Sequence, residues 1–89
     1  MQVAVEISMY PLTEQFEPPI IRFIQQLKEE AGIQVYTNEL STQVAGEYDL
    51  VMDTVQAAIK ASFGGSQKCS FVLKVLNIEM QPGRSVEVQ

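Results

Sequence analysis

The chain contains no histidine and no tryptophan, and it has a single cysteine. Without histidine it lacks the usual general base, the commonest zinc ligand and the side chain that titrates near neutral pH. Cys69 cannot form an internal disulfide. Its neighbours Lys68 and Ser70 give no metal-ligand spacing, so it reads as a small buried apolar residue. We therefore expect no metal site, no cofactor and no catalytic residue.

Basic residues are also few, with 6 Lys and Arg against 11 Asp and Glu and a formal net charge of -5. Nucleic acids and anionic membranes are bound by clustered positive charge, and here the basic residues are scattered along the chain. No apolar run approaches the roughly 18 residues of a membrane span, and the first residues lack the pattern of a secretion signal. The composition predicts a soluble, cytoplasmic protein with no nucleic-acid or membrane partner.

The 89 residues are 46% hydrophobic and 19% charged, which is ordinary for a folded globular protein. We expect one domain over residues 1–80 and a C-terminal tail over residues 81–89. A chain this short buries only about 60–65% of its unfolded surface, so association between copies would add stability. The tail, which opens with Pro82-Gly83, is expected either to fray or to add an edge strand through residues 85–88.

Alternation of apolar and polar residues predicts strands over residues 3–10, 33–38 and 41–48. Gly46 in the third strand suggests a bulge or the close approach of another group. The stretch 69–80 predicts a fourth strand. It is apolar on both faces except for Lys74, which is typical of a strand covered on both sides.

Helical spacing of apolar residues predicts two helices, over residues 17–31 and 50–63. Pro18 and Pro19 fit the first turn of the first helix, and Gly32 fits its C-terminal end. Asp49 is the expected N-cap of the second helix, which Gly64-Gly65 ends.

The resulting order, strand-helix-strand-strand-helix-strand, predicts an α+β fold of the ferredoxin-like type, βαββαβ. It has a four-stranded antiparallel sheet with two helices on one face. The other sheet face is left bare and carries Val72, Leu76 and Ile78 beside polar residues. Because an exposed apolar patch of this kind usually marks an interface, we expect a homodimer or homotetramer.

Three segments of the chain resemble the YkoF-like thiamine/hydroxymethylpyrimidine-binding family. Ser41-Thr42-Gln43-Val44-Ala45-Gly46 looks like its Ser-Thr-x-Val-x-Gly motif, and Ile7-Ser8-Met9-Tyr10-Pro11-Leu12 looks like its first strand and turn. The entry to the second helix, Gly46 to Met52, is similar too. The resemblance spans residues 3–80 and places the chain with the single-domain members, which assemble as homo-oligomers. It implies non-catalytic binding of thiamine or its pyrimidine moiety for vitamin uptake or salvage.

A site for an aminopyrimidine needs a surface for ring stacking and a few fixed polar groups. The candidate ligand-binding residues are Ser8, Tyr10, Tyr36, Asn38, Ser41 and Thr42. Five of them also have a structural interpretation: local hydroxyl bonding for Ser41 and Thr42, cross-strand packing for Tyr36, and turn formation for Asn38. Tyr10 before Pro11 could be a rigid strand exit, and Glu6 beside Lys74 could be only an ion pair. No Arg/Lys clamp or glycine-rich loop is present, so we expect an unphosphorylated ligand.

Two other classes of function share this fold. An acylphosphatase needs a glycine-rich loop and an arginine after the first strand, and residues 10–17 contain neither glycine nor arginine. A regulatory or oligomerisation module without thiamine binding is the remaining alternative. Thermal shift with thiamine, hydroxymethylpyrimidine and amino acids separates it from the thiamine-binding hypothesis.

Overall fold

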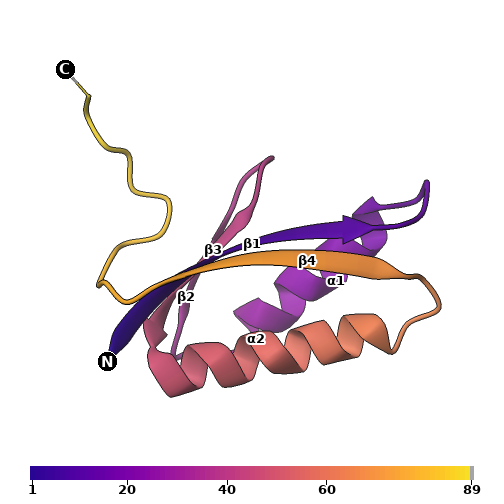
Figure 1. Ribbon diagram of the computed structural model, residues 1–89, viewed down its shortest axis with the longest axis horizontal. Coiled ribbons are helices and arrows are strands. Elements are labelled where there is room, and N and C mark those ends of the chain that lie inside the picture. The colour runs from indigo at the N-terminus through magenta and orange to yellow at the C-terminus, as the bar shows by residue number, and fades with distance from the viewer. Residues whose placement is uncertain (89) are drawn as a thin grey trace.

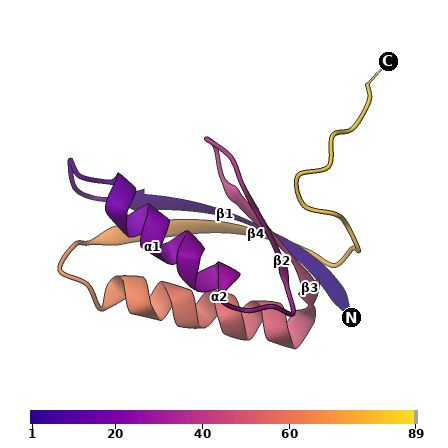
Figure 2. The same cartoon turned by 180° about the vertical axis from the view of Figure 1, so that it is seen from behind.

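The computed structural model describes residues 1–88. Its elements are β1 (Gln2–Pro11), α1 (Glu17–Lys28), β2 (Gln34–Thr37), β3 (Thr42–Glu47), α2 (Tyr48–Phe63) and β4 (Cys69–Leu76). The four strands form one sheet in the order β2-β3-β1-β4, and every neighbouring pair is antiparallel. Both helices cover the same face of this sheet (Figures 1 and 2). The predicted ferredoxin-like α+β fold is confirmed.

The core lies between the sheet and the two helices. Val3, Val5 and Ile7 of β1 point toward the helices and are at most 2% exposed. They pack with Phe23 and Leu27 of α1, and with α2 through Val51, Val55 and Ala58. Within residues 1–88, neither helix combines the length and the apolar character needed to cross a membrane.

Other side chains approach Gly46 of β3 closely, as predicted from the glycine in this strand. A Cβ atom there would lie 3.3 Å from Val51 Cγ2 of α2 and 3.4 Å from Ile33 Cγ2. The register between β1 and β3 runs through Gly46 without a bulge. The glycine therefore allows α2 to pack closely against β3.

The ends of the helices differ from the predicted ones. The N-cap of α2 is Glu47, whose carboxylate accepts from the Leu50 N–H at 3.2 Å, so the prediction of Asp49 is wrong. The reason is that β3 passes into α2 without a loop, which moves the first helical turn two residues earlier. The helix α1 ends at Lys28 with Glu29 as its C-cap, so Gly32 lies in the following connection instead.

The strand β4 ends at Leu76, four residues before the predicted end, and it is an edge strand of the sheet. Val72, Leu73, Val75 and Leu76 are all at least 36% exposed. The expectation that both faces are covered is therefore wrong within this chain. On the helix side Phe71 packs against Phe23 of α1 and Phe63 of α2. Leu73 and Val75, farther along the same side, stay exposed. Cys69, the first residue of β4, was expected to be buried and is only partly buried.

The chain after β4 turns back over the sheet face opposite the helices, which we call the open face (Figures 1 and 2). The Gly83 N–H donates to Gln43 Oε1 at 2.8 Å. Met80 and Pro82 line a small cavity together with Ala4, which is only 6% exposed. We call residues 80–83 the strap. Residues 77–88 contain no strand, so the tail does not extend the sheet.

Candidate functional site

The strand β1 is longer than its neighbour β3, and this difference opens the sheet at one end. The pairing of β1 with β3 ends at Ile7 opposite Thr42, whereas its pairing with β4 continues to Pro11 opposite Cys69. The β2–β3 hairpin turns over Asn38 to Ser41 and diverges from the end of β1 (Figures 1 and 2). Residues 8–11 of β1 therefore have a strand partner on one side only.

The free side of β1 presents backbone hydrogen-bonding groups. The Tyr48 N–H donates to the Met1 carbonyl at 2.9 Å, so odd-numbered residues of β1 direct their N–H and C=O toward β3. The Leu12 N–H donates to the Lys68 carbonyl at 2.8 Å, so even-numbered residues face β4. Met9 thus directs one donor and one acceptor toward the gap beyond the end of the β1–β3 pairing.

A cleft of about 360 Å³ occupies this gap. Residues 7–11 of β1 form one wall and residues 37–42 of the β2–β3 hairpin form the opposite wall. Ile20 and Ile24 of α1 contribute an apolar floor, and Phe16 lies where the chain enters α1. A volume of this size is within the usual range for small-molecule sites.

Five of the six candidate residues line this one cleft: Ser8, Tyr10, Asn38, Ser41 and Thr42. Ser8 and Tyr10 are two positions apart on β1, so both side chains are on the open face. If the β1–β3 register is continued past Ile7, Ser8 lies opposite Ser41. Tyr10 is 54% exposed, so its ring is available at the cleft. Residues separated by more than thirty positions in the sequence are therefore brought together.

Two of these residues also have structural roles. Thr42 is on the helix face of β3, is 6% exposed, and shares a hydroxyl–hydroxyl hydrogen bond with Thr37. Asn38 Oδ1 accepts from the N–H groups of Leu40 at 2.9 Å and Ser41 at 3.1 Å. The Asn38 oxygen thus holds the hairpin turn, which leaves its amide NH2 as the group able to meet a ligand.

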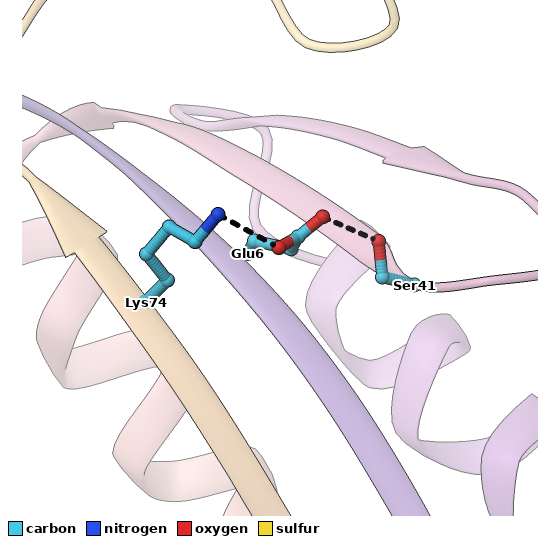
Figure 3. Close-up of polar contacts among 3 residues, drawn as sticks. All are labelled: Glu6, Ser41 and Lys74. Carbon is cyan, nitrogen blue, oxygen red and sulfur yellow. Dashed lines mark hydrogen bonds and ion pairs between the residues drawn. The ribbon is translucent and has the colours of Figure 1, made fainter.

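Ser41 is part of a chain of polar contacts across the open face (Figure 3). Its hydroxyl donates to Glu6 Oε2 at 3.0 Å, and Glu6 Oε1 lies 3.5 Å from Lys74 Nζ. The expected ion pair between Glu6 and Lys74 is therefore present. It is solvent-exposed, so its contribution to stability is small, at about 0–1 kcal/mol.

Tyr36 is the one candidate that lies outside the cleft lining. It is on the open face of β2, opposite Gln43 of β3, beneath the strap. Gly83 has a φ of +75° there, and a Cβ atom on it would come within 2.5 Å of Tyr36 Cδ1. The structure thus associates Tyr36 with the C-terminal tail and the other five candidates with the cleft.

A family model described as thiamine-binding protein matches residues 5–88 of the chain. The chain belongs to the thiamine-binding protein family. The match includes both walls of the cleft and nearly all of the tail. A thiamine-related role follows from this membership. No curated protein matches the chain by sequence.

Solved structures support the fold of this family member. A hypothetical protein from Methanocaldococcus jannascii superposes with a TM-score of 0.76 at 20% identity, over 90% of this chain and 84% of that one. A protein from Streptococcus pneumoniae superposes with a TM-score of 0.80 at 17% identity, over 90% of each chain. A Thermotoga maritima protein assigned provisionally to thiamine biosynthesis or salvage gives 0.65 at 22% identity, over 82% of each chain. At these identities the likeness establishes the fold alone.

Sequence reasoning missed the apolar residues of the family member's cleft. Ile20 and Ile24 belong to the apolar spacing that predicts this helix, which is typical of core residues, and the partly buried Ile24 does pack against the core. Phe16 is 51% exposed and could have been noticed as an isolated aromatic residue just before a helix that opens with two prolines. Glu39 of the hairpin turn, which the sequence offered with Glu6 and Glu47 as a possible partner for a thiazolium cation, adds a carboxylate to the lining. Among the described residues that line the cleft, none is lysine or arginine.

Proposed function

We propose that this chain binds thiamine, or its hydroxymethylpyrimidine moiety, in the cleft between β1 and the β2–β3 hairpin, without chemical conversion. The observation that carries the proposal is the convergence of Ser8, Tyr10, Asn38, Ser41 and Thr42 on one small cleft. Membership of the thiamine-binding protein family supports the choice of ligand. We propose that binding serves vitamin uptake, salvage or homeostasis in the cytoplasm.

The chemistry of the cleft suits a flat heteroaromatic ring. An aminopyrimidine has donor and acceptor groups along its edge, and the Met9 N–H and C=O supply one partner of each kind. The exposed Tyr10 and Phe16 rings offer surfaces for stacking, and Ile20 and Ile24 provide apolar contact beneath. These features together favour a ring that lies across the gap and hydrogen-bonds to the Met9 backbone, where β3 no longer pairs with β1.

The charges of the cleft favour an unphosphorylated ligand. Thiamine carries a thiazolium cation, which the Glu39 carboxylate or the Tyr10 ring can stabilise. A diphosphate would need cationic partners, and the described cleft residues include no lysine or arginine. We therefore propose that thiamine binds more tightly than thiamine diphosphate.

The residues of the cleft support binding and not catalysis. Its hydroxyl groups have no histidine to activate them, since the chain contains none. The Thr42 hydroxyl is buried and bonded to Thr37, and the Ser41 hydroxyl donates to Glu6. We propose that these groups hold the ligand and transfer no atoms to or from it.

Calorimetric titration with thiamine tests this proposal, with Tyr10→Ala as the informative variant. We expect heat of binding with the unmodified protein and at least a roughly tenfold weaker affinity for Tyr10→Ala, since a stacked aromatic contact is lost. Tyr48→Ala is the matched control because Tyr48 is similarly exposed, at 42%, but lies outside the cleft. Absence of binding to the unmodified protein would favour a regulatory or oligomerisation module.

We further propose that the protein is a homodimer or homotetramer. Support comes from β4, an edge strand whose valine and leucine side chains are exposed in the single chain. The strap covers part of the open face near Ala4 and Ala45, each of which lines a cavity together with Met80, so β4 is the more accessible apolar surface. A second copy that pairs along β4 would bury this surface and leave the cleft accessible at the β2–β3 end of the sheet.

A further inference from the structure

Ser41 lines the cleft, but its hydroxyl is already engaged on the open face. The Ser41 Oγ donates to Glu6 Oε2 at 3.0 Å, and the second oxygen of Glu6 lies 3.5 Å from Lys74 Nζ (Figure 3). The three side chains come from the end of the hairpin turn, from β1 and from β4. Glu6 itself is not among the cleft-lining residues. It therefore acts on the cleft through Ser41.

The number of protons in this contact decides what Ser41 can offer to a ligand. A serine hydroxyl has one proton to donate and two lone pairs that accept. An ionised carboxylate only accepts, so the proton between Ser41 and Glu6 must come from Ser41. A ligand that reaches Ser41 Oγ from the cleft therefore meets an acceptor and no donor.

We propose that Glu6 is a specificity-determining positioning residue, which fixes Ser41 as a hydrogen-bond acceptor and so selects ligands that present a donor to it. This inference rests on the proposed function. For a pyrimidine ligand the selected group is an exocyclic amine, and a carbonyl at the same ring position is rejected. The rejection has a physical basis, because two acceptors in contact leave both without a partner and repel each other.

Lys74 has a different part in this arrangement. Its ion pair with Glu6 is exposed, with side-chain exposures of 67% for Lys74 and 42% for Glu6, so solvent can replace the ammonium group. Loss of Lys74 leaves the Glu6 carboxylate and its hydrogen bond to Ser41 in place. A Lys74 variant is therefore a suitable control for a change in surface charge near the cleft.

The test compares the affinity for thiamine with the affinity for its 4-oxo analogue, in which a carbonyl replaces the exocyclic amine. We expect the unmodified protein to prefer thiamine by about tenfold or more, the size of a lost hydrogen bond with an acceptor left unpaired. Glu6→Gln should reduce this preference to within about threefold, because the glutamine amide can donate to Ser41 and release the serine proton toward the ligand. Lys74→Met should retain the preference.

A second variant keeps the test valid if Glu6→Gln folds poorly. Ser41→Ala removes the acceptor itself and should also reduce the preference to within about threefold. Binding of thiamine with no preference over the 4-oxo analogue, or a Glu6→Gln protein that keeps the full preference, would overturn this inference and leave the proposed function standing. Failure of the unmodified protein to bind either compound would overturn both.

Discussion

Asn38 holds a turn and lines the cleft with different atoms of one side chain. Its Oδ1 accepts from the N–H groups of Leu40 and Ser41, at 2.9 and 3.1 Å, so the amide NH2 remains for a ligand. Asn38→Asp keeps an acceptor oxygen and removes that donor. We expect unchanged stability in urea denaturation and weaker thiamine binding in calorimetry.

Asn38→Ala provides the comparison, because it removes the acceptor as well. Loss of the two turn hydrogen bonds should lower the free energy of unfolding by about 0.5–1.5 kcal/mol. Glu39→Ala in the same turn removes no acceptor for these N–H groups and should leave turn stability unchanged. Equal thiamine affinity of the unmodified protein and Asn38→Asp would show that Asn38 acts only on the turn.

The roles of Asn38 and Ser41 were predicted better by residue type than by position in the sequence. Asparagine in a short hairpin turn and serine at a strand end have few possible hydrogen-bond partners. Their side chains are short and polar, so they bond to nearby backbone or to neighbouring strands. Tyr36 was a candidate because it is aromatic and near a strand end. The structure associates it with Gly83, and no local pattern could indicate a contact between residues 47 positions apart in the chain.

The strand β4 presents both a backbone edge and apolar side chains. Even-numbered residues of β4 direct their backbone groups to β1, so Phe71, Leu73 and Val75 direct theirs outward. Val72 is 58% exposed near the middle of this edge. A charge placed there should oppose association along β4, as natural edge strands use lysine for this purpose.

We therefore expect Val72→Lys to weaken self-association at least about tenfold in sedimentation measurements, with unchanged circular dichroism. Val86→Lys is the control, because Val86 is 79% exposed but belongs to the tail. Association of Val72→Lys equal to that of the unmodified protein would exclude β4 as the interface. A molar mass of a single chain for the unmodified protein would contradict the homo-oligomer proposal itself.

The helix α2 shows why element boundaries are harder to predict than elements. The apolar stripe correctly identified the helix, whereas the cap was assigned to Asp49 because aspartate is a frequent N-cap. The actual cap, Glu47, is the last residue of β3 and is positioned by the strand before the helix. Since the cap depends on where the strand ends, sequence pattern alone could not decide between the two acidic residues.

The strap connects the end of the chain to the middle of the sheet. Gly83 donates to Gln43 and lies against the Tyr36 ring, which leaves no room for a side chain at position 83. Arg84 follows directly and is exposed, so it is a site at which trypsin can report release of the tail. The sequence of this cleavage site is unaltered by a change at Tyr36.

We expect Tyr36→Ala to increase the rate of trypsin cleavage after Arg84 by about fivefold, because loss of roughly 1 kcal/mol of contact raises the population of the detached tail. Thiamine affinity should not change. Tyr48→Ala, again as control, should leave the cleavage rate unaltered. Unchanged cleavage together with weaker thiamine binding would instead assign Tyr36 to the ligand.

The amino-acid sequence by itself determined the order of the elements, the two faces of each strand and the apolar stripes of the helices. These properties depend on residue type and on periods of two or 3.6, which are local. It also indicated most of the polar groups of the cleft. Only the tertiary structure decided where those groups meet, because the gap arises from a difference in strand pairing between β1 and its two neighbours. The same is true of Glu6 beside Ser41 and of the strap over Tyr36, since contacts between distant segments depend on how the chain folds back on itself.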